Sequence, residues 1–444
     1  MGKTIYFLGI GGIGMSALAR FYMQRGERVA GYDHARTALT DSLQTEGAQI
    51  HFDEDINQIP TDVDFVIYTP AIPTDSQEFI YFQEKGIPMY KRSQMLGKLA
   101  QGFPTVAVAG THGKTTTTAM IAQLLLPYRR LLAFIGGIAK NFDGNFLLHH
   151  NYDTVVAEAD EFDRSFLTLF PTIAVITSMD ADHLDIYGDK QQLMESFQLF
   201  ANQIDKNGYL IIHEAVADKI NHPHKLVYGV GDKCDFRISA VEMHENRASF
   251  TLATADFCYQ KIEMRVSGMH NVLNAAAACA VGSIMQLTET QIKTQMNDFR
   301  GVKRRFDYQI ETEDLVFIDD YAHHPEEIRA ILTSVKKLYP HKEVTVIFQP
   351  HLYSRTRDFA QQFANILALA DQVILLDIYP ARELPIPGIT SQFLLDLIPM
   401  SCKKLLKKEE LLPYLQQNRP KILLTIGAGD IDKLVPVIRA GLSS

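Results

Sequence analysis

The chain has 444 residues, of which 43 are Lys or Arg and 52 are Asp or Glu, and its formal net charge is −9. A hydrophobic fraction of 46% and a charged fraction of 21% are typical of globular proteins, and they argue against a fibrous chain, a disordered chain or a general nucleic-acid binder. Four widely spaced cysteines and the lack of any apolar run of about 20 residues argue against a disulfide framework and a membrane span, so we expect a cytoplasmic protein of about three domains.

The N-terminal part of the chain alternates between strand and helix patterns. An apolar, β-prone run over residues 4–10 ends in glycines and continues into the helical pattern MSALARFYMQRG. Further strands are predicted at residues 28–33 and 63–72, and the segment SQEFIYFQEKG predicts a second helix. Such alternation is typical of a parallel sheet, and we expect it to form one domain over residues 1–102.

A second domain is expected over residues 103–303, after a weak break at AQGFP. Its first strand, TVAVAG, runs into a glycine-rich turn and a helix that reaches about Leu126. Alternating polar and apolar residues over 236–266 predict antiparallel hairpins added to the sheet, and the helix NVLNAAAACAVGSIM closes the domain. The other predicted strands of this domain cover residues 154–160, 172–180, 208–213 and 225–230.

The remaining residues, 304–444, predict a third domain of the same kind. Four apolar strands, LVFIDDY, EVTVIFQP, QVILLDIYP and ILLTIGAGD, alternate with helices near residues 325–338, 356–369 and 430–440. The predicted fold class is therefore α/β, with three domains that are each built on a largely parallel sheet.

The first strand-to-helix turn carries the sequence GIGGIG, which satisfies the pattern G-x-G-x-x-G. Free amides and the helix dipole at such a turn favour a diphosphate group, and an acid at the end of the next strand stands where a dinucleotide site binds ribose. Taken alone, these residues indicate NAD, and the alternative is a tight turn that binds nothing. The candidate ligands of the diphosphate-containing molecule are Gly11, Gly12, Ile13, Gly14 and Asp33.

The next strand-to-helix turn is the strongest local signal in the chain. It consists of Gly110, Thr111, His112, Gly113, Lys114, Thr115 and Thr116. In a phosphate loop of this kind, backbone amides cradle the β-phosphate, the lysine reaches the β/γ oxygens, and a threonine hydroxyl completes a magnesium shell. Val108 stands where the pattern G-x-x-x-x-G-K-[ST] has its first glycine, so the loop is a shortened variant. The alternative is a chance Gly-Lys-Thr sequence on a turn.

Two acidic clusters follow predicted strands of the second domain. They comprise Glu158, Asp160, Glu161 and Asp163 in EADEFD, and Asp180, Asp182, His183 and Asp185 in DADHLD. Both clusters open at the carboxyl edge of a parallel sheet, where such sheets bind ligands, and magnesium prefers hard oxygen ligands. We assign the metal to Glu158 and His183, while the other acids support these ligands or cap helix N-termini.

Three further polar clusters lie where periodicity alone would not place them. His270 and Asn274 stand near the head of an apolar helix and are candidates for contacts to a base. Arg304 and Arg305 lie at the second domain boundary, where an arginine could reach a transferring phosphate, the alternative being solvated charges. The segments DDYAHHP and HLYSRTR each end a strand, and their His, Tyr and Arg residues suit a small anionic amino compound.

Taken together, these motifs resemble those of the Mur ligase family over nearly the whole chain. They stand in the family's order: GIGGIGMSALA, GTHGKTTT, EADEFDRSFL, DADHLDIYG, SGMHNVLNAAAA, RRF, DDYAHHPEE, FQPHLYSRTRD, IYPARELPIPG and GAGDI. The resemblance implies an N-terminal Rossmann-like domain for a UDP-sugar, a central P-loop ATPase-like domain with added antiparallel strands, and a C-terminal Rossmann-like domain for an amino acid. It also implies that GIGGIG holds the diphosphate of UDP, so we expect no NAD.

Within the family, the resemblance is strongest to members that join L-alanine to the lactyl carboxylate of UDP-N-acetylmuramate in peptidoglycan precursor synthesis. It implies that ATP phosphorylates this carboxylate and that the alanine amine then displaces phosphate from the acyl phosphate. The implied partners are UDP-N-acetylmuramate, L-alanine, ATP and Mg²⁺, with neither nucleic acid nor membrane. We expect a monomer or a weak homodimer.

The family's functional residues map onto this sequence by motif. The residues that the resemblance implies in catalysis are Lys114, Glu158, His183 and Arg305. Those that it implies in ATP binding are the phosphate loop from Gly110 to Thr116 and His270, Asn274, Arg305 and Asp320. Those that it implies in magnesium binding are Thr115, Glu158 and His183, and those that it implies in alanine binding are Tyr321, His323 and Arg355.

Two positions depart from the family pattern. Leu352 stands where many members have an arginine, so we expect the alanine carboxylate on Arg355 with Arg357 as a helper, and Ser178 replaces a common asparagine.

Two alternative functions stay open. One is a relative that joins a recycled peptide to the same sugar nucleotide, against which the segment FQPHLYSRTRD argues. The other is an NAD-dependent oxidoreductase or a nucleotide-sensing module, which leaves EADEFD, DADHLD and DDYAHH unexplained.

Overall fold

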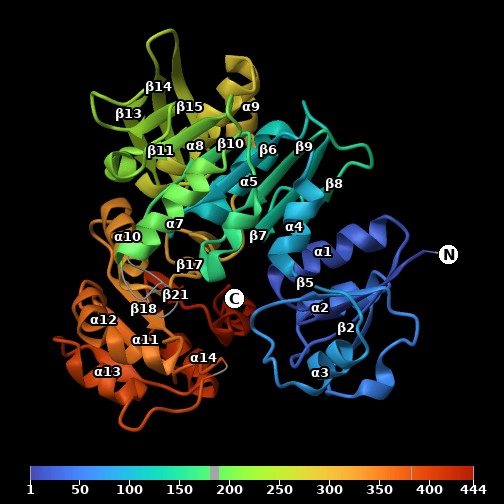
Figure 1. The fold of residues 1–444 in the computed structure, drawn as a ribbon. Helices are drawn as coiled ribbons and strands as arrows, with labels where there is room; N and C mark the ends of the chain where they lie inside the picture. The colour runs from blue at the N-terminus through green and yellow to red at the C-terminus, as the bar shows by residue number, and fades with distance from the viewer. Residues whose placement is uncertain (1, 181–189, 382, 444) are drawn as a thin grey trace. The chain divides into compact units, whose positions relative to one another are not determined.

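The computed structural model describes residues 2–180, 190–381 and 383–443. Its strands form three sheets with helices packed beside them (Figure 1). The chain is divided into two compact units. Unit 1 consists of Met1–Glu242, Ser249–Met264 and Asn271–Arg300, and unit 2 consists of Met243–Ala248, Arg265–His270 and Gly301–Ser444.

The first sheet of unit 1 has five parallel strands in the order β3-β2-β1-β4-β5. This order is that of the first five strands of a Rossmann fold, and all residues of β1 are buried because a central parallel strand is covered on both faces. The strands are β1 (Thr4–Leu8), β2 (Arg28–Tyr32), β3 (Gln49–His51), β4 (Phe65–Tyr68) and β5 (Met89–Lys91). The helices are α1 (Ile13–Gln24), α2 (Ala38–Thr45), η1 (Ile56–Gln58), α3 (Gln77–Glu84) and α4 (Arg92–Ala100).

The second sheet has ten strands in the order β15-β14-β13-β12-β11-β10-β6-β9-β7-β8. Strand β6 lies parallel between β9 and β10, whereas β7 and β8 form an antiparallel hairpin. The first strands are β6 (Thr105–Ala109), β7 (Leu131–Ala139), β8 (Gly144–Leu148), β9 (Thr154–Glu158) and β10 (Ile173–Ile176). The others are β11 (Tyr209–His213), β12 (Lys225–Gly229), β13 (Phe236–His244), β14 (Arg247–Ala253) and β15 (Cys258–Met264). The associated helices are α5 (Lys114–Leu125), η2 (Phe162–Thr168), α7 (Lys190–Asn202), η3 (Glu214–Lys219), α8 (Met269–Ile284) and α9 (Glu289–Asp298).

Helix α1 and the hairpin β7–β8 join the cores of these two sheets. The ring centroid of Phe21 on α1 lies 6.5 Å from that of Phe134 on β7 and 6.4 Å from that of Phe146 on β8. Asn145, which is fully buried on β8, donates a hydrogen bond to the carbonyl of Ile13 at 2.6 Å. The start of α1, where the glycine turn ends, is thereby attached to the second sheet.

The third sheet belongs to unit 2 and has the order β16-β17-β21-β18-β19-β20. All its neighbouring strands are parallel except β16, which is antiparallel to β17. The strands are β16 (Asp307–Glu311), β17 (Val316–Asp320), β18 (Val344–Phe348), β19 (Gln372–Leu375), β20 (Lys403–Leu405) and β21 (Ile422–Ile426). The helices are α10 (Pro325–Leu338), α11 (Tyr353–Asp358), α12 (Ala360–Leu367), α13 (Ser391–Leu397), α14 (Lys408–Gln417), η4 (Asp430–Lys433) and α15 (Val435–Leu442).

The predicted α/β class with three sheet-based domains is confirmed, including the strands added to the central sheet. The single helix predicted at 356–369 is two helices, α11 and α12, which Phe359 separates. The domain boundaries at 102 and 303 stay predictions. Over the described ranges, no helix combines the length and the apolar character that crossing a bilayer requires.

Candidate active site

Two glycines in left-handed conformations shape the turn between β6 and α5. Gly110 has φ +134° and Gly113 has φ +82°, values that other residues rarely adopt. A Cβ atom on Gly110 would lie 2.2 Å from Oγ1 of Thr177, and one on Gly113 would lie 2.6 Å from Oδ1 of Asn274. The turn leads directly into the N-terminus of α5 at Lys114, an arrangement that favours binding of an anion.

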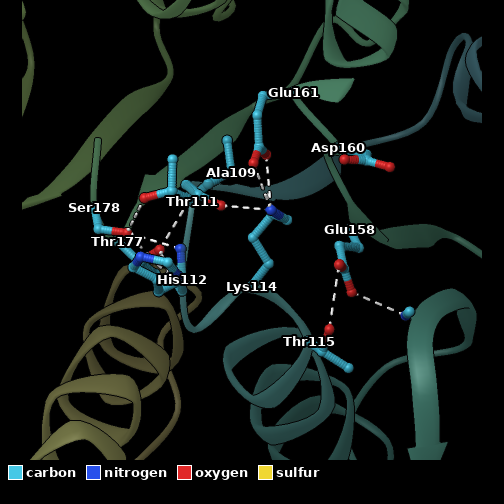
Figure 2. Close-up of polar contacts among 12 residues, drawn as sticks. Ala109, Thr111, His112, Lys114, Thr115, Glu158, Asp160, Glu161, Thr177 and Ser178 are labelled. Carbon is cyan, nitrogen blue, oxygen red and sulfur yellow. Dashed lines mark hydrogen bonds and ion pairs between the residues drawn. The ribbon is translucent and has the colours of Figure 1, made fainter. Parts of the chain in front are cut away.

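The segment after β10 holds this turn in place (Figure 2). Oγ of Ser178 accepts a hydrogen bond from the backbone N–H of His112 at 2.8 Å and lies 2.9 Å from the hydroxyl oxygen of Thr111. The hydroxyl of Thr177 donates to the carbonyl of His112. Ser178 stands where the resemblance led us to expect asparagine, and its hydroxyl supplies the contacts that anchor the turn.

Lys114, the lysine predicted to reach the phosphates, is surrounded by oxygen acceptors (Figure 2). Its Nζ donates to both carboxylate oxygens of Glu161, at 2.9 and 2.7 Å, and to the carbonyl of Gly110 at 2.7 Å. Burial by itself lowers the pKa of Lys114, but the carboxylates of Glu161 and Asp160 raise it more, so this pKa lies above its ordinary value. The ammonium group therefore stays charged at neutral pH.

Glu158, a predicted magnesium ligand, ends β9 beside the phosphate loop. Its Oε1 accepts a hydrogen bond from the Thr115 hydroxyl at 3.2 Å, and its Oε2 accepts one from the N–H of Gly136 on β7 at 2.9 Å. A Cβ atom on Gly136 would lie 2.2 Å from this Oε2, so any other residue there would displace the carboxylate from its present position. The other predicted metal ligand, His183, lies outside the described residues.

The oxygen donors of Glu158 and Thr115 fit a magnesium ion. Among the residues that the structure describes, no group of three His, Cys, Asp or Glu side chains is arranged to hold a metal. Magnesium commonly binds through one or two carboxylates together with substrate phosphates and water. A single carboxylate and a hydroxyl beside a phosphate loop match that mode of binding.

A pocket of about 240 Å³ extends from the glycine turn after β1 to the acidic segment after β9. Its lining includes Gly12, Ile13, Gly14, Arg92, Glu158 and Asp160. Arg92, at the start of α4, forms an ion pair with Asp160 at 3.5 Å. A Cβ atom on Gly14 would lie 2.6 Å from Nη1 of Arg92. The pocket therefore brings the candidate diphosphate-binding turn and the candidate magnesium ligand into one cavity.

Asp33 shapes the glycine turn. Its Oδ2 accepts a hydrogen bond from the N–H of Gly11 at 2.8 Å, and its Oδ1 accepts one from the N–H of Ala35 at 3.1 Å. A Cβ atom on Gly11 would lie 2.8 Å from Oδ2 of Asp33, which explains the glycine at this position. The predicted role of Asp33 in binding the UDP-sugar stays a prediction.

In unit 2, Arg305 lies between two residues with left-handed backbones. Arg304 has φ +62° and Phe306 has φ +48°, conformations that cost about 1–3 kcal/mol each. The N–H of Phe306 donates to Asp320 at 2.6 Å, and the N–H of Tyr321 donates to the carbonyl of Arg304 at 2.8 Å. The guanidinium groups of Arg304 and Arg305 each lie 5.1 Å from the ring centroid of Tyr321. Such strain persists where surrounding contacts enforce it, and it clusters at functional sites.

Two buried aspartates end β17 beside this segment. Burial raises the pKa of Asp319 to about 6, against the opposing effect of Arg304. It raises the pKa of Asp320 to about 7, against the opposing effect of Arg305. Asp319 also accepts a hydrogen bond from the hydroxyl of Thr425 at 2.7 Å. The predicted contacts of Asp320 and Arg305 with ATP stay predictions.

Aromatic side chains gather after β17 and β18. The ring centroids of Tyr321 and His323 lie 5.3 Å apart, and those of His323 and His351 lie 6.0 Å apart. The ring of Tyr379 stacks on His351 at 5.8 Å. The structure thus brings Tyr321 and His323 together and adds Tyr379, for which the segment IYPARELPIPG is the sequence signal.

Arg355, the third residue predicted to bind alanine, lies on α11. The residue before this helix is Leu352, which has φ +71° and donates its N–H to the carbonyl of Tyr379 at 3.0 Å. The N–H of Ser354 donates to Glu383 at 2.9 Å. These contacts attach the start of α11 to the segment after β19, and the contact of Arg355 with alanine stays a prediction.

The two residues predicted to contact a base belong to different units. His270 is part of unit 2, where its ring centroid lies 5.5 Å from that of Phe306. Burial lowers the pKa of His270 to about 4, so its imidazole is neutral at pH 7. Asn274 is part of unit 1, where it is buried against Gly113 of the phosphate loop. Their contacts with adenine stay predictions.

The sequence analysis did not predict three residues that contact side chains of the site directly. Gly136 and Arg92 lie in segments for which no element was predicted, and Glu161 was left as a supporting acid. The glycine pair in FIGGIAKN is a signal for Gly136, because adjacent glycines in an apolar strand indicate a close approach of other atoms.

Three family models match successive parts of the chain. The model described as "Mur ligase family, catalytic domain" matches residues 4–104, "Mur ligase middle domain" matches residues 108–282, and "Mur ligase, glutamate ligase domain" matches residues 304–429.

Curated relatives match over nearly their whole length. The UDP-N-acetylmuramate–L-alanine ligase of Cytophaga hutchinsonii is 44% identical, with 98% of this chain and 96% of the relative covered. The protein of the same name from Phocaeicola vulgatus is 45% identical, with 98% and 97% covered.

Solved structures show the same similarity. The UDP-N-acetylmuramate-alanine ligase of Thermotoga maritima superposes with a TM-score of 0.85 at 27% identity, over 99% of this chain and 100% of that one. A murein peptide ligase from Psychrobacter arcticus has a TM-score of 0.72 at 21% identity, over 100% and 99% of the two chains, and so shares the fold.

Proposed function

The chain belongs to the Mur ligase family, and from this premise we propose that it is an ATP-dependent ligase that joins L-alanine to the lactyl carboxylate of UDP-N-acetylmuramate. This reaction is a step of peptidoglycan precursor synthesis. Relatives that bear the name of this activity match nearly the whole chain at 44% and 45% identity. They support alanine as the acceptor, rather than a recycled peptide.

The observation that carries this proposal is the pocket shared by the glycine turn and Glu158. A ligase of this kind must bring an acid carried on a nucleotide-linked sugar to the terminal phosphate of ATP. The turn at Gly12 to Gly14 would hold the UDP moiety at one end of the pocket. Glu158 and the adjoining phosphate loop would hold the magnesium and the triphosphate at the other end.

The proposed chemistry requires no nucleophile from the protein. An oxygen of the lactyl carboxylate attacks the γ-phosphorus, ADP leaves, and an acyl phosphate forms. Lys114 and the amides of its loop orient the triphosphate and neutralise its charge. Mg²⁺ held by Thr115, Glu158 and His183 would neutralise the charge that develops on the β/γ oxygens. Arg305 is proposed to stabilise the transferring phosphate.

The second step joins the two substrates. The uncharged amine of alanine attacks the acyl carbon, inorganic phosphate leaves, and the amide loses a proton. Tyr321, His323 and Arg355 are proposed to hold alanine, with Arg355 on its carboxylate. Because an acyl phosphate hydrolyses in water, the amine must reach the acyl carbon before water does.

Product analysis tests this function. The protein is mixed with ATP, Mg²⁺, UDP-N-acetylmuramate and either L-alanine, another amino acid or the recycled tripeptide. We expect ADP release to require both the sugar nucleotide and an acceptor, and to be fastest with L-alanine. Preferred use of the tripeptide would assign the chain to the recycling reaction, and bound nicotinamide without ADP release would support the oxidoreductase alternative.

Location and assembly are the remaining parts of the proposal. All four cysteines are free thiols, and thiols persist in a reducing compartment, so we propose that the enzyme works in the cytoplasm. A monomeric or weakly dimeric state stays a prediction.

A further inference from the structure

We propose that Glu161 competes with phosphate for the ammonium group of Lys114 and thereby weakens the affinity of the phosphate loop for nucleotide. This inference rests on the proposed use of ATP. It concerns a residue outside the phosphate loop, since Glu161 lies in the segment that follows β9.

The geometry of the pair carries the inference (Figure 2). The side chain of Glu161 is 0% exposed, and its two carboxylate oxygens accept hydrogen bonds of 2.9 and 2.7 Å from Nζ of Lys114. The carbonyl of Gly110 accepts a third at 2.7 Å. An ammonium group has three N–H donors, and here all three are directed at protein oxygens.

A phosphate oxygen must therefore replace at least one of these acceptors in order to bond to Lys114. When Glu161 gives up the ammonium, its buried carboxylate loses a charge partner, which is costly in a desolvated position. The same carboxylate then lies close to an incoming phosphate of like charge. Both effects oppose nucleotide binding, and an uncharged amide at this position would remove both.

The neighbouring acids have other partners, so the competition is specific to Glu161. Asp160 forms its ion pair with Arg92 at 3.5 Å and is 34% exposed. Glu158 accepts hydrogen bonds from Thr115 and Gly136. The charge of Asp160 also raises the pKa of Lys114, but the three acceptors of the ammonium named above belong to Glu161 and Gly110. Asp160→Asn therefore measures how much of the effect comes from removing one negative charge from this segment.

The test measures ADP binding by isothermal titration calorimetry, once with Mg²⁺ and once with EDTA. We expect Glu161→Gln to bind ADP roughly tenfold more tightly than the wild type under both conditions, a change of about 1.4 kcal/mol. Asp160→Asn should tighten ADP binding by less than about threefold, because water and counter-ions screen its partly exposed charge. An equal gain in the two variants would contradict a role specific to the hydrogen-bonded carboxylate of Glu161.

Several results would overturn the inference. Equal or weaker ADP binding by Glu161→Gln would do so, and so would a gain that requires Mg²⁺, because that dependence would place Glu161 on the metal. If Glu161→Gln does not fold, Glu161→Asp replaces it: withdrawing the carboxylate by one methylene should tighten ADP binding roughly threefold, and an unchanged affinity would contradict the proposal. Failure of the wild type to bind ADP would instead refute the proposed function.

Discussion

At the scale of single residues, hydrogen bonds to partners far away in the sequence hold the side chains of Lys114 and Glu158 in place. The N–H of Gly136, on β7, donates a hydrogen bond to the carboxylate of Glu158 on β9. The carboxylate of Glu161, in the segment after β9, accepts one from the ammonium of Lys114 at the start of α5. A motif specifies residue types at a fixed spacing, so the sequence analysis could identify Lys114 and Glu158. The pairing of these residues with Gly136 and Glu161 could not be predicted this way, because folding brings together segments that no motif links in the sequence.

Replacing Gly136 by Ala should disable ligation by displacing a carboxylate. The added Cβ would lie 2.2 Å from Oε2 of Glu158, so this side chain must rotate away from Thr115. We expect kcat/KM to fall roughly 100-fold and the Mg²⁺ requirement to rise, as measured by steady-state kinetics over a Mg²⁺ titration. Gly144→Ala on the same hairpin is the control, since its Cβ would meet no atom nearer than 3.4 Å. Equal losses in the two variants would contradict this role for Gly136.

Replacing Lys114 by Ala should abolish ligation while the secondary structure is retained. We expect kcat to fall at least roughly 1,000-fold, because the charge at the phosphates is lost. The free energy of unfolding should fall by about 3–5 kcal/mol, because the buried carboxylate of Glu161 loses its ion-pair partner. Urea unfolding and circular dichroism measure these effects.

The added substitution Glu161→Gln separates the two effects of Lys114→Ala. It should restore much of the lost stability, because the buried carboxylate that lost its lysine partner is gone, without restoring turnover. Near-normal turnover by Lys114→Ala alone would refute the assignment of the phosphate loop.

At the scale of elements, the hairpin β7–β8 positions the helix that follows the glycine turn. Asn145 on β8 bonds to the carbonyl of Ile13 in the first turn of α1. The hairpin was not predicted, because the glycine pair within β7 interrupts the apolar pattern of that strand, and Gly136 of this pair leaves room for the carboxylate of Glu158. Helix α4 was missed for a related reason: a Cβ on its Gly97 would lie 2.4 Å from the carbonyl of Thr168. A glycine that makes room for atoms of a neighbouring segment thus interrupts the hydrophobic pattern by which its own strand or helix would be predicted.

Asn145→Ala should impair sugar-nucleotide binding in particular. The first turn of α1 loses a buried anchor, so we expect the KM for UDP-N-acetylmuramate to rise roughly tenfold while that for ATP changes less than about twofold. The control is Asn141→Ala on the same hairpin, which loses hydrogen bonds to the backbones of Asp298 and Arg300 instead. A larger rise in the KM for ATP than for the sugar nucleotide would refute this role of Asn145.

The start of α8 should contribute a pH-dependent stability. Burial lowers the pKa of His270 from 6.5 to about 4, so between these values the unfolded chain binds more protons than the folded chain. Stability from this group is full above pH 6.5 and is lost as the pH falls toward 4. The difference in unfolding free energy between wild type and His270→Asn should change by about 2 kcal/mol between pH 7 and pH 5, to the disadvantage of the wild type. Urea titrations at both pH values measure it, and a constant difference would contradict the buried, neutral state of His270.

At the scale of the whole molecule, the three-domain α/β organisation was predictable because long apolar strands alternate with helices in three successive segments. The order of strands within each sheet was not predictable from the sequence, because a crossover connection can place the next strand on either side of the preceding one. Strands of three residues, such as β3, β5 and β20, are too short to show a period. The left-handed backbones of Arg304 and Phe306 also have no signal in residue type, since they depend on contacts with Asp320 and Tyr321.

The central claim is that the lactyl carboxylate of the sugar nucleotide attacks the terminal phosphate of ATP. UDP-N-acetylmuramate labelled with ¹⁸O in that carboxylate, incubated with the protein, ATP, Mg²⁺ and L-alanine, tests it directly by mass spectrometry of the released phosphate. One labelled oxygen per inorganic phosphate is the predicted result, because the carboxylate oxygen leaves with phosphorus when the amine attacks. Release of unlabelled phosphate during amide formation would contradict the account.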